Sequence, residues 1–236
     1  MDASTTTPDT TVTVTAAAPS EPEAARRSSW SCRALDTVVS AVLLVVLIPV
    51  FLVIAAIVRL DSGGPALFRQ RRIGRDQVPF TVNKFRTMYA GVGHDKHRAF
   101  VQGLIAGEVP GDGEDERPKF FKIARDPRVT RAGHFLRKSS LDELPQLWNV
   151  LRGEMSLVGP RPPISYEVEH YPAHWFGRFA VKPGVTGLWQ VSGRSELTLE
   201  QMIELDLEYA RTRSFWVNVK ILLRTIPVVL NGRGAA

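Results

Sequence analysis

Cysteine is almost absent from this sequence of 236 residues, which contains Cys32 alone. A single cysteine excludes an internal disulfide, and without a C-x-x-C pair the usual thiolate zinc sites and thioredoxin-like redox chemistry are excluded too. The fold must therefore be stabilised by its core. The five histidines form no metal-binding pattern, because Pro172 interrupts the helix that the spacing of His170 and His174 would need.

Strong compositional bias is absent as well. Mean hydropathy is −0.06, too low for a polytopic membrane protein, so that class is excluded. With 23% charged and 8% aromatic residues and no visible repeat, the chain is not collagen-like, coiled-coil or wholly disordered. The length fits one domain, alone or with appendages.

Basic residues are missing from residues 1–25, which contain four acids and are rich in Thr, Ala, Ser and Pro. This segment has a net charge of −4 in a chain of +6, which leaves +10 for the remainder. It has too little apolar area to offset the entropy of ordering, so we predict a disordered polar tail over residues 1–30. It is not a signal peptide, because no basic start precedes an apolar run. The basic remainder indicates an anionic partner: a nucleic acid, a phosphorylated substrate or a membrane surface.

Charge is also missing from Thr37–Val58, a run of 22 residues. A helix of this length measures about 33 Å, which is enough to cross the hydrocarbon core of a bilayer. A buried core helix is the alternative, although the run has no polar face that would favour it.

Two features of this run favour a re-entrant helix over a straight span. Pro49 lies in its middle and predicts a kink. Arginines flank both ends: Arg26, Arg27, Arg33, Arg59, Arg69, Arg71, Arg72 and Arg75. Because positive residues prefer the cytoplasmic side, a straight span would leave one basic flank outside. A helix–break–helix over residues 31–60 keeps both flanks inside, and we predict that form.

Residues 61–231 are expected to form one small, helix-rich domain of mixed α/β class, followed by a tail over 232–236. Residues 64–90 favour short strands, and 91–118 favour a solvated loop. Thr198-x-x-Gln201 is a capping box that predicts a helix of about 15 residues containing Asp206 and Tyr209. Phe215–Leu230 predicts a further helix, for which the membrane interface and the core are equally open.

The densest chemistry lies in residues 117–161, where ten residues are Lys or Arg and four are acidic. Asp142 and Glu143 form an adjacent acidic pair in this basic setting. Ser140-x-x-Glu143 matches a capping box, so a helix start with two first-turn acids is one interpretation. The surrounding cations favour a phosphate-and-metal site, in which one carboxylate holds Mg²⁺ and the other attacks phosphorus.

Two rigid turns follow this stretch. Gly159–Pro163 presents Arg161, whose guanidinium suits contacts to phosphate or to a base edge. Pro183–Gly187 is followed by Gln190 and Arg194, for which a plain turn remains a sufficient explanation.

Six stretches, taken in order, carry a family resemblance: LDTVVSAVLLVVLIPV, GGPALFRQRRIG, NKFRTM, DPRVTRAGHFLRKSSLDELPQLWNVLRGEMSLVGPRPP, VKPGVTGLWQVSGRS and LDLEYA. Over residues 33–231 the sequence resembles the bacterial sugar transferases, the monotopic polyprenyl-phosphate phosphoglycosyl transferases. It resembles the catalytic half of the exopolysaccharide-type enzymes, whose larger members carry extra transmembrane helices and a further domain.

The resemblance implies a reaction and a location. Members of this family transfer a sugar-1-phosphate from a UDP-sugar to polyprenyl (undecaprenyl) phosphate and release UMP, through a covalent phosphosugar–aspartyl intermediate. We therefore expect an initiating enzyme of exopolysaccharide or related glycan synthesis that depends on Mg²⁺. We expect it at the bacterial inner membrane, with a re-entrant helix broken at Pro49 and the catalytic domain on the cytoplasmic face.

Family roles are carried over residue by residue. Asp142 would be the nucleophile and Glu143 the Mg²⁺ ligand, while Lys84 and Arg86 would contact phosphate or position the metal. The other expected substrate-binding residues are Arg128, Arg131, Arg137, Arg161, Gln190, Arg194, Asp206 and Tyr209, with Arg161 assigned to the nucleotide. Asn218 stands where family members often have an acid.

The expected partners are a UDP-sugar, polyprenyl phosphate and membrane lipids, without nucleic acid; a homo-oligomer stays open. The alternative is a non-enzymatic, membrane-anchored binder of anionic lipid or nucleic acid, based on the +10 body. Such a binder would bind in a salt-sensitive way and would need neither Asp142 nor Glu143.

Overall fold

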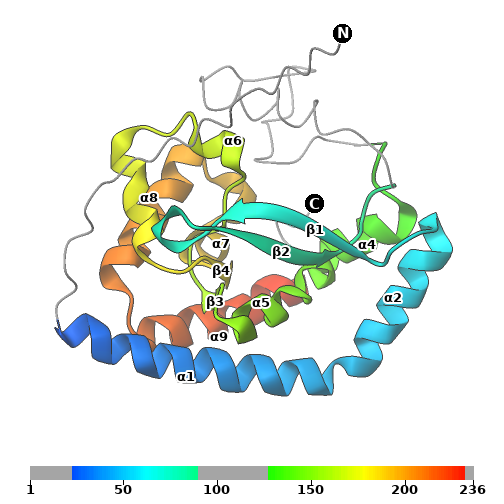
Figure 1. Ribbon diagram of the computed structural model, residues 1–236, viewed down its shortest axis with the longest axis horizontal. Helices are drawn as coiled ribbons and strands as arrows, with labels where there is room; N and C mark the ends of the chain where they lie inside the picture. Colours follow the sequence, from blue (N-terminus) through cyan, green and yellow to red (C-terminus); the bar gives the residue numbers. More distant parts are fainter. Residues whose placement is uncertain (1–22, 90–126, 232–236) are drawn as a thin grey trace, which may run out of the picture.

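The computed structural model describes residues 23–89 and 127–231 (Figure 1). The predicted loop at 91–118 and most of the predicted tail lie outside these residues. The described part is helix-rich with two small sheets, which confirms the mixed α/β class. Its α-helices are α1 (Glu23–Val46), α2 (Ile48–Ser62), α4 (Arg131–Ser139), α5 (Gln146–Arg152), α6 (Ser165–Val168), α7 (Leu188–Ser192), α8 (Leu199–Thr212) and α9 (Phe215–Asn231). Its strands are β1 (Leu67–Ile73), β2 (Pro79–Phe85), β3 (Ser156–Val158) and β4 (Gly184–Thr186), and its 3-10 helices are η1 (Arg75–Gln77), η2 (Leu141–Glu143), η3 (Ala173–Ala180) and η4 (Arg194–Glu196).

The apolar run forms a bent pair, α1 and α2, which meet at Leu47 with an angle of 63°. Pro49 lies in the first turn of α2, where its missing N–H leaves no hydrogen bond unmade, so the predicted break at this proline is confirmed. Within the described residues no single helix is long and apolar enough to cross a bilayer, whereas this bent pair meets that requirement jointly. The helical stretch begins at Glu23, ahead of the boundary expected at residue 31.

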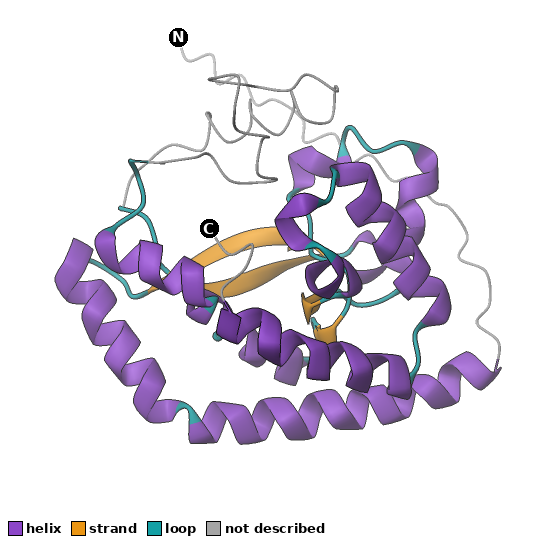
Figure 2. Cartoon of the chain, turned by 180° about the vertical axis from the view of Figure 1, so that it is seen from behind, coloured by secondary structure: helices purple, strands orange, loops and turns teal. Residues whose placement is uncertain are grey.

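Two polar anchors attach α1 to the rest of the domain. Asp36, just before the uncharged run, accepts hydrogen bonds from Ser156 Oγ at 2.8 Å and from the Leu157 N–H at 2.9 Å. Arg33 donates to the carbonyls of Val150 and Leu151 at 2.6 and 2.8 Å, and so caps the C-terminal end of α5. The bent pair is therefore packed against the rest of the domain as part of the fold. In the view of Figure 2, the pair runs as an arch along the lower edge of the molecule.

Short strands were predicted over residues 64–90, and β1 and β2 form there as an antiparallel hairpin, with pairs running from Leu67↔Phe85 to Ile73↔Pro79. Residues 74–78 join the strands, and within them the Val78 N–H donates to the Arg75 carbonyl at 3.0 Å. Asp76 and Gln77 between these two residues are left-handed, with φ of 55° and 61°, as a type I′ turn requires. Short strands β3 and β4 pair in parallel. The largest core cluster lies around these strands and is formed by Val82, Leu147, Val150, Met155, Leu157, Val158, Val181, Tyr209 and Ile221.

The two predicted capping boxes have opposite outcomes. Thr198 and Gln201 form a complete reciprocal box at the start of α8, which confirms that prediction. The box predicted at Ser140-x-x-Glu143 is wrong. Ser140 ends α4 in the left-handed conformation, with φ 58° and ψ 15°, and its side chain caps no helix. The reason is tertiary, because Lys84 engages the Glu143 carboxylate and Arg194 engages the Ser140 hydroxyl.

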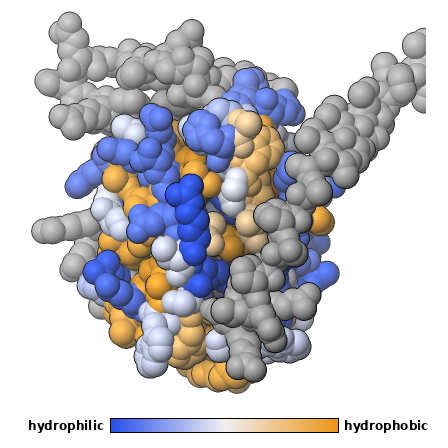
Figure 3. Space-filling view, turned by 90° about the vertical axis from the view of Figure 1, so that its left-hand side faces the viewer, coloured by the Kyte–Doolittle hydropathy of each residue, from blue (hydrophilic) through white to orange (hydrophobic). Residues whose placement is uncertain are grey.

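Helix α9 has both of the faces that its sequence left open. Asn218 and Ile221 are buried against the core, while Trp216 and Leu223 are 75% and 62% exposed. In the side view of Figure 3, apolar and polar residues are interspersed, and part of the apolar surface lies at the lower edge, the edge on which α1 lies in Figure 1.

Candidate functional site

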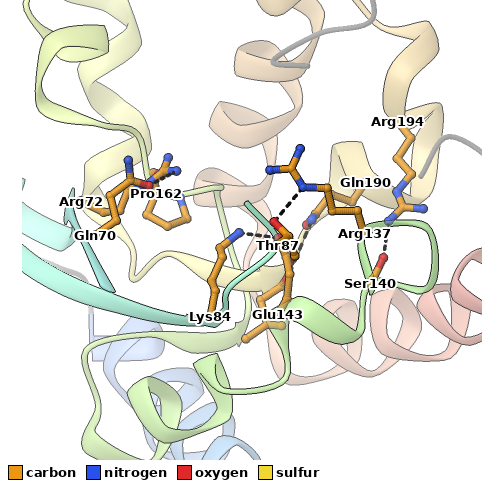
Figure 4. Close-up of polar contacts among 11 residues, drawn as sticks. Gln70, Arg72, Lys84, Thr87, Arg137, Ser140, Glu143, Pro162, Gln190 and Arg194 are labelled. Atoms are coloured by element: carbon orange, nitrogen blue, oxygen red, sulfur yellow. Dashed lines mark hydrogen bonds and ion pairs between the residues drawn. The ribbon is translucent and has the colours of Figure 1, made fainter. Parts of the chain in front are cut away.

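The centre of the candidate site is an ion pair between strand and turn. Lys84 Nζ, on β2, lies 2.7 Å from Glu143 Oε1, on η2. The two side chains are 26% and 32% exposed, so the pair is sheltered but open to a ligand. Figure 4 shows both side chains pointing into one space above the hairpin, together with Arg137, Gln190 and Arg194. The structure therefore brings the KFR and SLDE segments together.

Asp142 precedes Glu143 on the same 3-10 turn and is 9% exposed. A carboxylate so sheltered is held in a narrow range of orientations, which suits a nucleophile. Across the described ranges no group of three or more His, Cys, Asp or Glu side chains lies close enough to hold a metal ion. Two adjacent carboxylates nevertheless fit Mg²⁺, which proteins usually bind through one or two carboxylates completed by substrate phosphates.

The backbone around this pair is held in an unfavourable conformation. Ser140 and Arg194 both have positive φ, 58° and 51°, although neither is glycine. Arg194 Nη2 donates to Ser140 Oγ at 3.1 Å, so the two left-handed residues are linked directly (Figure 4). Left-handed backbone of this kind costs about 1 kcal/mol or more at a non-glycine residue and is frequent at functional sites.

Two further arginines brace the entrance to the turn. Arg137, at the end of α4, donates from Nε to Thr87 Oγ1 at 2.9 Å. Arg86 is buried and donates from Nη2 to Ser62 Oγ and to the carbonyl of Gly63, so it fixes the end of α2. Its Nε and Nη1 are buried without a hydrogen bond to any described residue, which leaves donors for a ligand or for a small rearrangement.

Arg161 lies beside a second cationic group that sequence reasoning did not assign. Buried Arg72 donates to the carbonyl of Pro162 at 3.0 Å and to Gln70 Oε1. Burial first, and then the nearby Arg161, lower the pKa of Arg72 to about 10. Arg161 itself is 3.9 Å from the buried Glu167 carboxylate. Strand alternation could have identified Arg72, because it lies on the same face of the hairpin as Lys84.

Asp206 and Tyr209 support the fold around the site. Asp206 Oδ2 accepts from Arg178 Nη2 at 2.6 Å, in a pair whose side chains are 2% and 5% exposed. Tyr209 Oη donates to the Val158 carbonyl at 2.9 Å and lies 2.8 Å from Asn218 Oδ1. Arg178, on η3, was missed by sequence reasoning, because no local pattern distinguishes it from a surface cation.

The remaining predicted residues lie around the edge of the site. Gln190 Nε2 is 3.5 Å from the Val185 carbonyl, and its Oε1 is buried with no hydrogen bond to the described residues. Arg128 contributes its carbonyl, which accepts from the Tyr89 N–H at 3.0 Å. Arg131 is exposed at the start of α4.

These features define a class of protein: a small, helix-rich α/β domain with a bent apolar helix pair and two carboxylates on a turn surrounded by cations. The sequence matches the family described as "Bacterial sugar transferase" over residues 27–232. The chain belongs to that family.

Curated relatives agree with this assignment. "UDP-galactose-lipid carrier transferase" of Erwinia amylovora is 43% identical over 203 residues, 86% of this chain and 41% of the relative. "Exopolysaccharide production protein ExoY" of Rhizobium meliloti (strain 1021) is 38% identical over 86% of this chain and 87% of its own length. "UDP-glucose:undecaprenyl-phosphate glucose-1-phosphate transferase" of Caulobacter vibrioides is 40% identical over 84% of this chain and 69% of its own length. The chain therefore spans less than half of some relatives and most of others.

Proposed function

We propose that the chain transfers a sugar-1-phosphate from a UDP-sugar to polyprenyl (undecaprenyl) phosphate and releases UMP, as the initiating step of exopolysaccharide or related glycan synthesis. The observation that carries the proposal is the Asp142–Glu143 pair on a turn contacted by Lys84 and Arg194, in a chain of the bacterial sugar transferase family. The printed names of relatives support a UDP-sugar donor and an undecaprenyl phosphate acceptor.

The proposed reaction has two displacements at one phosphorus atom. A carboxylate oxygen of Asp142 first attacks the β-phosphorus of the UDP-sugar, and the bond from that phosphorus to the oxygen bridging the two phosphates breaks. UMP leaves with the bridging oxygen and its electron pair. A phosphate oxygen of polyprenyl phosphate then attacks the same phosphorus, and the bond to Asp142 breaks. The carboxylate is regenerated, and the product is a polyprenyl diphosphate sugar.

The cations act by positioning and by neutralising charge, which is most of what phosphoryl transfer requires of a protein. Lys84 keeps Glu143 beside the nucleophile. Arg137, bound to Thr87, and Arg86, bound at the end of α2, would add positive charge for the phosphates. Arg161, which lies near the buried Arg72, would contact the nucleotide. Arg128 and Arg131 would contribute to the positive field at a greater distance.

Glu143 would hold Mg²⁺ together with oxygens of the donor diphosphate, because the chain offers few carboxylates there. When bound, the ion would neutralise charge on the two phosphates. Lys84 then has a second role, since it must release or share the Glu143 carboxylate as the donor enters.

The acceptor phosphate lies at a bilayer surface, so the site must work next to lipid. The bent pair α1–α2 exposes large apolar side chains on both arms, among them Val45, Val46, Ile48 and Leu52. We propose that these enter the inner membrane as a re-entrant element, with the catalytic domain on the cytoplasmic face.

A donor-panel assay tests the proposal. The full chain in detergent with Mg²⁺, polyprenyl phosphate and labelled UDP-sugars should release UMP and form a labelled lipid. Asp142→Asn should lower turnover by about 10³-fold or more, because it removes the nucleophile. Glu143→Gln should require a higher Mg²⁺ concentration for half-maximal rate, and the exposed Glu169→Gln should behave as wild type.

Donor without acceptor should leave a sugar-phosphate adduct on the wild-type chain but not on Asp142→Asn, as read by intact-protein mass. Retained turnover in Asp142→Asn would remove this residue as the nucleophile. Absence of UMP and of lipid product for every donor would remove the activity itself.

A further inference from the structure

A cavity lies on the face of the hairpin opposite Lys84 and the candidate site. It has a volume of about 970 Å³ and is bounded by the bend of α1–α2, by the hairpin and by one side of α5. Leu44 and Phe51 come from the two arms of the bent pair, Arg69 from β1, Trp148 from α5, and Lys182 from the segment before β4. We call this space the hairpin cavity.

Strand alternation separates the hairpin cavity from the candidate active site. Arg69 pairs with Asn83, and both line the cavity. Lys84, the next residue after Asn83, points to the opposite face, where it meets Glu143. The donor and acceptor phosphates of the proposed reaction therefore have no direct path to the hairpin cavity through the sheet.

The cavity carries excess positive charge. Its lining contains Arg69, Arg75, Arg152 and Lys182, but Glu154 as its one acid. Arg152 lies 3.4 Å from Glu154, and Arg75 lies 3.2 Å from Asp76. The side chains of Arg69 and Lys182 form no hydrogen bond or ion pair with any residue in the described part of the chain. These two cationic side chains are therefore available to bind an anionic ligand.

Lys182 sits among further cations. A Cβ built on Gly153 would lie 3.3 Å from Arg33 Nη2 and 3.5 Å from Lys182 Nζ, so both cations converge on that glycine. Burial and then Arg33 lower the pKa of Lys182. A bound anion would offset both effects, because it would favour the charged ammonium.

The apolar part of the lining is continuous with the surface that is proposed to enter the membrane. Leu44 and Phe51 flank the bend, whose neighbours Val45, Val46 and Ile48 are 68%, 65% and 51% exposed. On α5, Trp148 lines the cavity and is 51% exposed, and tryptophan is an amphipathic residue suited to a bilayer surface. The lining of the cavity therefore combines apolar side chains beside the bend with two cationic side chains that have no partner among the described residues.

We propose that the hairpin cavity binds an anionic phospholipid of the bilayer, with Arg69 and Lys182 contacting its phosphate and with Leu44, Phe51 and Trp148 contacting its chains. The lipid would join the bent pair to the hairpin and so hold the domain at the membrane surface. The inference rests on the membrane docking of the proposed function, but not on its chemistry.

Native mass spectrometry of the full chain tests this site. The protein is equilibrated with phosphatidylglycerol or with phosphatidylcholine and then exchanged into lipid-free detergent. We expect one phosphatidylglycerol retained per chain, with phosphatidylcholine lost. Arg69→Gln/Lys182→Gln should retain at most about one tenth as much phosphatidylglycerol as wild type, because it removes both of the cations proposed to contact the lipid phosphate. The matched double variant Lys138→Gln/Arg211→Gln removes one lysine and one arginine that are exposed and do not line the cavity, and it should retain lipid as wild type does.

The same measurement on Asp142→Asn makes the outcome independent of catalysis, since its lipid retention should equal that of wild type. Equal loss of lipid in both double variants would show non-specific attraction and would overturn the site. Undiminished retention in Arg69→Gln/Lys182→Gln would overturn it as well. Recovery of polyprenyl phosphate in place of the phospholipid would mean that the cavity serves the acceptor.

Discussion

At the scale of single residues, Ser140 has a backbone conformation that serine disfavours but that its tertiary contacts require. Its left-handed backbone is unfavourable for serine, yet it turns the chain so that Asp142 and Glu143 follow on a 3-10 helix. The hydroxyl accepts from Arg194, whose own backbone is left-handed. Two strained residues bonded to each other indicate that the turn is held in shape by its partners, beside the residues proposed for chemistry.

Substitutions of Ser140 separate the hydroxyl from the backbone strain. Ser140→Ala loses the hydrogen bond and keeps the strain, whereas Ser140→Gly loses the bond and relieves the strain. We expect Ser140→Gly to be more stable than Ser140→Ala by about 1 kcal/mol in urea unfolding. We expect both to lower kcat to a similar extent, since both release Arg194. Equal stability of the two variants would contradict the inference that the left-handed backbone of Ser140 is strained.

At the scale of elements, one buried ion pair joins η3 to α8. Arg178 Nη2 and Asp206 Oδ2 are 2.6 Å apart, and Arg178 also donates to the Arg161 carbonyl at 2.9 Å. Burial opposes the charge of Arg178, but Asp206 raises its pKa, so the guanidinium stays protonated at any physiological pH. The Arg178–Asp206 pair lies outside the candidate site, and through the Arg161 carbonyl it supports the turn that presents the Arg161 side chain.

Asp206→Asn leaves a buried guanidinium without its counter-charge. We expect a loss of about 3–5 kcal/mol in the free energy of unfolding, measured by urea titration in detergent. Arg178→Met/Asp206→Leu removes both charges and should recover a large part of that loss. A double variant as unstable as the sum of its single variants would contradict the proposed coupling.

At the scale of the whole molecule, the bent pair α1–α2 packs against the domain on one side and is proposed to enter the membrane on the other. Its inner side is bound through Arg33 and Asp36 to α5 and β3, and its outer side exposes valine, isoleucine and leucine. A re-entrant pair returns the chain to the side from which it started, whereas a straight span would separate the N-terminal tail from the domain.

Reporter tags therefore distinguish the two topologies in cells. Tags placed at residue 20 and after the C-terminus should both be protected from a membrane-impermeant label, because a re-entrant pair keeps both on the cytoplasmic side. Labelling of one tag alone would indicate a span. A chain with a tag inside α8, which is part of the folded domain, controls for lysis of the cells.

Local chemistry explains the features that the sequence determined by itself. The break at Pro49, the capping box at Thr198 and the strands around KFR depend on backbone and short-range preferences, and the structure has all three. The acidic pair in SLDE could be recognised as chemical because its neighbours are cations. These features need no partner far away in the chain.

Contacts between distant segments decided the rest. Ser140 and Glu143 form no capping box because Lys84, 59 residues before Glu143, engages that carboxylate. Arg72 and Arg178 are buried through partners that no local pattern reveals, and the hairpin cavity exists because β1, α5 and the bent pair meet. Periodicity reports which face of an element is apolar, but not which distant charge or carbonyl it will meet. The sequence by itself therefore determined the elements and the reactive pair, and the tertiary structure decided how that pair is held.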